Sequence, residues 1–474
     1  MSKLTQKENG SLPAFLLVSS FIIHFFCFLE SFLSLGAPYF HQNCFLRKSK
    51  RVYRTIEVMK KERIIQQLPT AAEEEAEIPI LPQEIIVEIL SRLPIKSLCQ
   101  FRCVSKLWLS LISDPLLAKA HLKQTIKNDY FYSQRKRVII SSHNLYSLEY
   151  ESIGKDASCD ENLVASELDY PLKDNPNGLA ELLDSAKDGF LYCERSEDDE
   201  FPVMVKLNLP CCVNPRNWVD ILGSCNGLVC IAPDEDTLFL FNPSTRESKR
   251  IPDPPSEYAA SGLSVYGFGF DFVNDDYKVV KLGSGTVCVY SLRTDSWRKV
   301  VSFPFDDNVY ESGVLLNGAI HWMASRGDGA DYECVVAAFS LEKEVFLDMP
   351  APDVVDTSFE FVVGVLNGCL CVLHSRNQMH NDFWVMTKYG IGESWTKLTL
   401  SISYICMKPL CLAHSGEALL EVDGKLLLYN LEDDSFRYLE VHGIPAGDGF
   451  EADTYLESLI SPNGYCRSGM QMQY

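Results

Sequence analysis

The spacing of apolar residues predicts a short helix that begins near residue 81. Ile85, Ile89 and Leu93 recur every four residues, with Ile86 and Leu90 beside them. This spacing places all five side chains on one stripe of an α-helix. The proline that follows at position 94 disfavours helical geometry for the residue before it, so the helix is expected to end there.

Two further short helices are predicted directly after this one. Their inward-facing apolar residues are Leu98, Phe101 and Val104 for the second, and Leu107, Trp108, Leu111 and Ile112 for the third, which ends near Asp114-Pro115. A unit of fewer than ~40 residues rarely buries its own core without help. We therefore expect the surplus apolar surface either to bind a partner protein or to pack on the next domain of this chain.

From about residue 125 the pattern changes to short strands separated by turn residues, which predicts an all-β region. Asn-Gly pairs at 226–227, 317–318 and 367–368 indicate tight hairpins, because both residues tolerate positive φ. The predicted strands include 137–140, 228–231, 237–241, 277–281, 287–290, 335–339, 370–373 and 425–429.

A repeat underlies these strands. Aromatic residues close apolar runs at Phe241, Tyr290, Phe339, Trp384 and Tyr429, with separations of 49, 49, 45 and 45 residues. A period near fifty is typical of β-propeller blades with four strands each. A large β-sandwich with coincidental spacing is the alternative. Residues 130–132 and 203–209 are further strand candidates for another blade or for the closing strand.

The first seventy residues carry a separate signal. Residues 9–29 contain no charge and are long enough to span a bilayer as a helix, and a basic cluster follows at 47–54. Three interpretations stay open: a membrane anchor that leaves the rest in the cytosol, a cleaved secretory signal, or an upstream extension that the working protein lacks, because Met59 offers a second start.

Composition narrows the function. The chain has 474 residues, of which 43 are basic and 64 acidic, for a net charge of −21. Such a charge disfavours binding to nucleic acid. The 17 cysteines include no C-x-x-C pair, and many lie inside apolar runs, so a reducing compartment and no bound metal are predicted. Cofactor-binding motifs are also absent from the sequence, so no cofactor is expected.

Residues 81–98, 101–108 and 111–115 together resemble an F-box, including both leucine-proline pairs and the late tryptophan. The resemblance implies docking onto a Skp-type adaptor and, through it, a cullin in a cullin-RING (SCF) ubiquitin ligase. The adaptor-binding positions it implies are Leu81, Pro82, Ile85, Leu90, Leu93, Pro94, Leu98, Val104 and Trp108. Some of these must instead hold the three helices together.

The β region resembles the F-box-associated domain of plant F-box/kelch-type proteins. The paired glycines of true kelch repeats are not evident, so the resemblance does not fix the number of blades. Six blades are favoured, with five or seven as alternatives. The segments that carry the resemblance are 221–230, 241–246, 266–271, 275–280 and 316–322.

These observations predict an α+β multidomain chain in which a short three-helix F-box precedes a mainly antiparallel β-propeller. The expected order is a leader at 1–76 that is disordered or tethers the chain to a membrane, an F-box at 77–122, a propeller at 123–460 and a tail at 461–474.

The resemblance implies a non-catalytic substrate receptor of an SCF ligase in the cytoplasm or nucleus, or tethered to a membrane facing the cytosol. A protein-interaction scaffold outside any ligase is the alternative function. An enzyme is disfavoured, because the acids Asp275, Asp276, Asp433 and Asp434 lie in predicted turns. No catalytic or metal-binding residue is predicted, and the residues that bind the target protein are not assigned.

Overall fold

The structure is a computed structural model. It describes residues 83–103, 106–142, 144–154, 163–171, 219–234, 237–255, 264–283, 285–305, 309, 311–327, 333–352, 360–375, 379–445 and 449–464. The apolar segment 9–29, the Leu81-Pro82 pair and the strand candidate at 203–209 lie outside these residues. Within the described part of the chain, no helix is long and apolar enough to cross a membrane.

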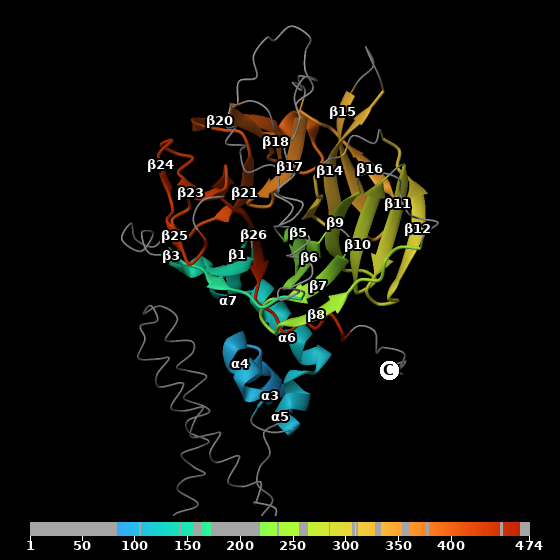
Figure 1. Cartoon of the computed structure of the whole chain (residues 1–474), viewed down its shortest axis with the longest axis vertical. Helices are drawn as coiled ribbons and strands as arrows, with labels where there is room; N and C mark the ends of the chain where they lie inside the picture. Colours follow the sequence, from blue (N-terminus) through green and yellow to red (C-terminus); the bar gives the residue numbers. More distant parts are fainter. Residues whose placement is uncertain are drawn as a thin grey trace, which may run out of the picture. The chain divides into compact units, whose positions relative to one another are not determined.

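Helices come first in the described chain (Figure 1). The three predicted helices are present, and the third ends at Ile112, just before Asp114-Pro115 as expected. The helices are α3 (Gln83–Leu90), α4 (Ile95–Phe101), α5 (Lys106–Ile112), α6 (Pro115–Ile126) and α7 (Asp129–Arg135).

Helix α7 lies where a strand was expected at 130–132, so the prediction of an all-β chain from about residue 125 is wrong at its start, and α6 is a fourth helix that the sequence interpretation did not predict. Asp114 caps α6 by accepting a hydrogen bond from the backbone N–H of Leu116 at 2.8 Å, and Pro115 occupies the first turn. Asn128 caps α7 by accepting from the N–H groups of Tyr130 and Phe131. Local capping therefore outweighs the strand preference of the aromatic run 130–132.

Six four-stranded antiparallel sheets follow, which confirms the six-blade propeller and excludes the β-sandwich (Figure 1). The first three blades are formed by β26 (Glu451–Leu456), β1 (Lys136–Ser141), β2 (Leu145–Glu149) and β4 (Ser166–Glu167); by β5 (Asp220–Cys225), β6 (Leu228–Asp234), β7 (Thr237–Asn242) and β8 (Glu247–Arg250); and by β9 (Val265–Asp271), β10 (Asp276–Gly283), β11 (Thr286–Ser291) and β12 (Ser296–Ser302).

The other three blades have the same strand order. They are formed by β13 (Val314–Leu316), β14 (Ala319–Arg326), β15 (Glu333–Ser340) and β16 (Phe346–Met349); by β17 (Glu360–Leu366), β18 (Cys369–Ser375), β19 (His380–Met386) and β20 (Trp395–Tyr404); and by β21 (Met407–Leu412), β22 (Ala418–Val422), β23 (Lys425–Tyr429) and β24 (Phe436–Tyr438). Smaller elements are the parallel pair β3 (Leu163–Val164) and β25 (Val441–His442), and the 3₁₀ turns η1 (Tyr150–Ser152) and η4 (Gly392–Ser394).

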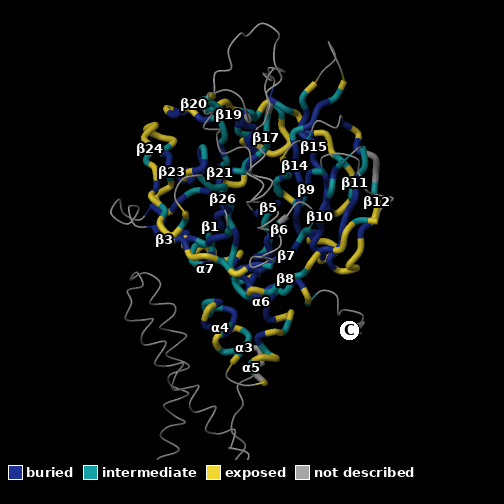
Figure 2. Tube along the Cα trace, in the orientation of Figure 1, coloured by how far each residue is buried: buried dark blue, intermediate teal, exposed yellow. Residues whose placement is uncertain are grey.

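The repeat seen in the sequence marks the third strand of five blades. The five aromatic residues lie in β7, β11, β15, β19 and β23 and are buried between blades, where Figure 2 shows dark blue strands. The Asn-Gly pairs are hairpin turns with positive φ at both residues, for example 50° at Asn317 and 77° at Gly318. Strand spacing and turn chemistry therefore predict the blades correctly.

The ring closes through the C-terminal strand. β26 pairs antiparallel with β1 over its full length, so the two ends of the propeller sequence share one blade (Figure 1). The first strands of successive blades contact one another around the centre, from β5 through β9, β13, β17 and β21 to β26. This arrangement pairs sheet edges that an open array would expose.

Candidate protein-interaction surfaces

Two of the nine predicted adaptor-binding residues lie in the core of this chain. Leu90 and Leu98 are 1% and 0% exposed and belong to one apolar cluster with Ile112. The same cluster contains Leu459 and Ile460, which follow the closing strand of the propeller. In this fold Leu90 and Leu98 join the helices to each other and to the propeller.

Three other predicted positions keep part of their surface accessible. Leu93, Pro94 and Trp108 are half-buried, and the Trp108 ring lies 6.3 Å from that of Phe101, centroid to centroid. Leu81, Pro82, Val104 and the side chain of Ile85 are outside the described residues.

The sequence interpretation missed two exposed leucines beside these positions. Leu109 of α5 is 48% exposed and Leu116 of α6 is 62% exposed. Leu109 falls between the inward-facing Trp108 and Leu111, and Leu116 directly follows Pro115. Helical spacing would have placed Leu109 on the outer face, and the Asp114 cap would have predicted the helix that carries Leu116.

The helices dock on turns at one end of the propeller. Arg102 Nη1 lies 3.1 Å from Glu247 Oε1, and Lys119 forms an ion pair with Asp275 in the β9–β10 turn. Cys99 Sγ contacts the Ser244 carbonyl at 3.9 Å, in the β7–β8 turn. Because strand direction alternates within a blade, these turns share one end of the propeller, and the opposite end is not covered by the helices.

Arg135, at the end of α7, fixes the turn between α3 and α4. It is 3% exposed, and its Nη2 donates to the carbonyls of Ser91 and Leu93 at 3.3 and 3.1 Å. Burial lowers the pKa of Arg135 to about 10, which leaves the guanidinium charged at neutral pH. A cation at carbonyls after a helix C-terminus is favourable, so Arg135 ties the Leu93-Pro94 turn to the first blade.

At the opposite end, acidic residues surround the start of the central strands. Glu451 and Asp453 begin β26, Asp220 begins β5, and Glu311 precedes β13. Burial raises the pKa of Glu451 to about 7, with the neighbouring charge of Lys408 opposing and those of Asp220 and Glu311 adding to the shift. Lys408 Nζ pairs with Asp453 Oδ2 at 2.9 Å. The described residues around the starts of these strands therefore carry net negative charge at this end of the propeller.

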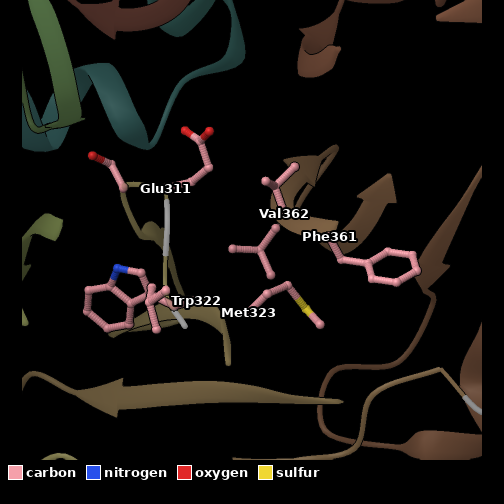
Figure 3. A pocket seen from close by; sticks show the side chains of 8 residues that line it. Glu311, Trp322, Met323, Phe361 and Val362 are labelled. Carbon is pink, nitrogen blue, oxygen red and sulfur yellow. The ribbon is translucent and has the colours of Figure 1, made fainter. Parts of the chain in front are cut away.

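A small hollow lies between two blades near this end. Figure 3 shows Glu311 and Trp322 on one side, and Phe361 and Val362 on the other. Its 240 Å³ of empty space includes open solvent, so the volume does not indicate an enclosed small-molecule site.

The four acids of the predicted turns have structural partners. Asp276 is 2% exposed and accepts a hydrogen bond from the Arg293 N–H at 2.9 Å. Asp433 accepts from the Ser435 N–H at 3.0 Å, and Asp434 accepts from the Tyr429 hydroxyl at 2.9 Å. With Asp275 paired to Lys119, all four acids stabilise turns.

Comparison with known proteins matches both halves of this architecture. Residues 78–119 match the family model for the F-box domain, and residues 196–442 match that for the F-box associated beta propeller domain. An Arabidopsis thaliana F-box/kelch-repeat protein, At3g23880, is 30% identical over 399 residues, which cover 81% of this chain and 96% of that protein. The Arabidopsis F-box protein CPR1 is 26% identical, with 80% and 88% covered.

The chain therefore belongs to the family of F-box proteins with an F-box-associated β-propeller. F-box domains generally bind Skp-type adaptors, and proteins that combine an F-box with a β-propeller are typically substrate receptors of SCF ligases. Members of this family are generally non-catalytic.

Proposed function

We propose that this chain is the substrate-recognition subunit of an SCF-type ubiquitin ligase. In this proposal the F-box binds a Skp-type adaptor, and through it a cullin, while the propeller holds a target protein. The observation that carries it is an F-box that buries Leu90 and Leu98 against its own propeller and still exposes Leu109 and Leu116. Exposed apolar side chains on a fixed helical unit favour a protein partner.

We assign adaptor contact to the accessible members of the F-box. These are the half-buried Leu93, Pro94 and Trp108 together with the exposed Leu109 and Leu116. Leu81, Pro82, Ile85 and Val104 stay predicted contacts from the sequence motif. Leu90 and Leu98 support the interface from the core rather than by direct contact.

Target binding is assigned to the propeller end that faces away from the F-box. Its loops are not used by the helices, and the acidic residues around Glu451 favour target segments with basic side chains. Such a receptor requires no catalytic residue of its own, because it raises the local concentration of the target near a separate transfer enzyme. The cytoplasm or nucleus is the compartment in which this role operates.

Co-purification with a Skp-type adaptor tests the proposal. The double variant Leu109→Asp/Leu116→Asp places two charges on the exposed apolar surface, and we expect at least a ~10-fold loss of bound adaptor. Leu347→Asp is the matched control, because Leu347 is an exposed leucine on β16 with 46% exposure. Leu98→Ala is unsuitable alone, because a cavity at a buried leucine typically costs ~2–5 kcal/mol.

Equal recovery of adaptor by the double variant and wild type would overturn the assigned surface. A ubiquitylation assay with the purified complex then distinguishes the receptor from the alternative scaffold. A receptor supports adaptor- and cullin-dependent ubiquitin transfer to a bound target, whereas a scaffold outside the ligase binds its partner with no transfer.

A further inference from the structure

Three residues with metal-ligating side chains meet on one face of the blade β17–β20. His374 lies near the end of β18, and His380 and Asp382 lie on β19. The pairing of β19 with β20 is irregular between His380 and Asp382, and the two side chains still lie together beside His374. The strand ends place this group at the propeller end that faces away from the F-box.

The geometry of the group is compact. The two imidazole rings stack with centroids 3.8 Å apart and planes 2° from parallel. His374 Nε2 lies 3.1 Å from Asp382 Oδ1. One nitrogen or oxygen atom from each of the three residues lies within 4.8 Å of the other two.

Neighbouring side chains hold these ligands in place. Lys397 pairs with Oδ2 of Asp382, which leaves Oδ1 directed at His374. The ring of Phe361, which pairs with His374 across the strands, lies 4.9 Å from its imidazole.

We propose that His374, His380 and Asp382 form a binding site for a divalent transition-metal ion, with zinc as its test ion. Two imidazoles and one carboxylate are a donor set that such ions accept, and a fourth position stays open for water or a partner's side chain. Bonds of ~2.0–2.2 Å require ligand atoms about 3.3 Å apart. The His374–Asp382 pair lies close to this spacing at 3.1 Å. Because the two stacked rings direct their nitrogen lone pairs in parallel planes, His380 must turn out of the stack to bind the same ion.

This site goes beyond the proposed receptor function and departs from the sequence-based expectation of no metal. The spacing His-x₅-His-x-Asp matches none of the usual zinc motifs. The three ligands come together only because the register of β18 against β19 places them on one face. An ion here would link the two strands at the free end of the propeller.

Titration of zinc chloride into the metal-free full chain, followed by calorimetry, tests the site. We expect one zinc per chain whose affinity falls at least ~10-fold in His380→Ala and in Asp382→Asn. His442→Ala is the matched control, because His442 is an exposed histidine on β25, outside the group. We expect zinc to raise the melting temperature of wild type and of this control, but not of the two ligand variants.

Two results would overturn the site. In one, both ligand variants bind zinc with the stoichiometry and affinity of wild type. That result would assign the ion to cysteines elsewhere in the chain. The other is no binding to wild type at micromolar zinc. If His380→Ala does not fold, the near-isosteric Asp382→Asn variant decides between these outcomes.

Discussion

Glu421 is a carboxylic acid that the fold keeps in its protonated form. It is 6% exposed at the end of β22, and Gly424 N–H donates to its Oε1 at 2.8 Å. Burial raises the pKa of Glu421 to about 8, far above the ordinary value of 4.5. The folded chain therefore holds this proton more tightly than the unfolded chain does. The resulting stabilisation is complete below pH 4.5 and is lost as the pH rises through about 8.

The variant Glu421→Gln should remove this dependence. The amide stays neutral at every pH and can still accept the Gly424 hydrogen bond, so we expect the variant to match wild type near pH 5. Above pH 8 it should be more stable than wild type by on the order of 5 kcal/mol. Urea unfolding at several pH values measures the difference. The exposed Glu440→Gln variant is the control, and a constant difference between Glu421→Gln and wild type across pH would contradict the prediction.

Apolar spacing at the residue scale predicts which side chains turn inward, but not what they pack against. The stripe through Leu90 was predicted correctly, and the structure shows that the propeller covers part of it. Leu109 stays exposed although it lies among the apolar residues Leu107, Trp108 and Leu111. The F-box could therefore be predicted as a motif, whereas the division of its apolar residues into core and surface depends on a domain more than a hundred residues away.

At the scale of single elements, two identical Asn-Gly hairpins lie in different surroundings. Gly227 and Gly318 have φ of 88° and 77°, both in the left-handed region. A Cβ added at Gly318 would meet nothing within 4 Å. A Cβ at Gly227 would lie 2.1 Å from Ser458 Oγ and 2.8 Å from the Leu456 carbonyl oxygen. The Gly318 hairpin therefore tests backbone strain alone, and the Gly227 hairpin adds a clash with the closing segment.

We expect Gly318→Ala to cost about 1–2 kcal/mol of unfolding free energy, the price of a left-handed alanine. Gly227→Ala should cost clearly more, because Ser458 and the backbone behind it must move. Equilibrium unfolding in urea compares the two variants on one chain. Equal losses would show that the contact with Ser458 carries no energetic weight.

Strands were predictable because their signal is local: apolar runs, a fifty-residue period and turn residues with positive φ. Helix α7 was not, because its aromatic residues 130–132 favour a strand, and only the Asn128 cap decides otherwise. Short elements depend on one hydrogen-bonded residue at their boundary, and such residues are common in loops as well.

At the scale of the whole molecule, sites arise from strand register and ring closure, which a single sequence does not reveal. His374 and Asp382 meet through the pairing of β18 with β19, and the acidic group around Glu451 contains residues from β5, β26 and the segment before β13. Each residue alone has the sequence context of an ordinary strand end. The period indicated the blades, but it did not indicate which strand ends lie close together at each end of the propeller.

Closure itself depends on a short C-terminal segment. β26 completes the blade of β1, and the buried Asn242 side chain donates to the carbonyls of Ser458 and Ile460 at 3.0 and 2.7 Å. Leu459 and Ile460 also lie in the apolar cluster shared with the F-box helices. One segment of about sixteen residues therefore joins the first blade, the second blade and the F-box.

Removal of residues 449–474 should abolish cooperative folding. The truncation exposes the edge of β1 and removes Leu459 and Ile460 from the apolar cluster shared with the F-box. We expect this combined loss to be larger than the ~5–15 kcal/mol that stabilises a typical domain. Removal of 465–474 alone is the matched control and should leave the melting transition unchanged. Circular dichroism during heating compares both truncations with the full chain. A cooperative transition at the wild-type temperature in the longer truncation would show that the ring is stable without its closing strand.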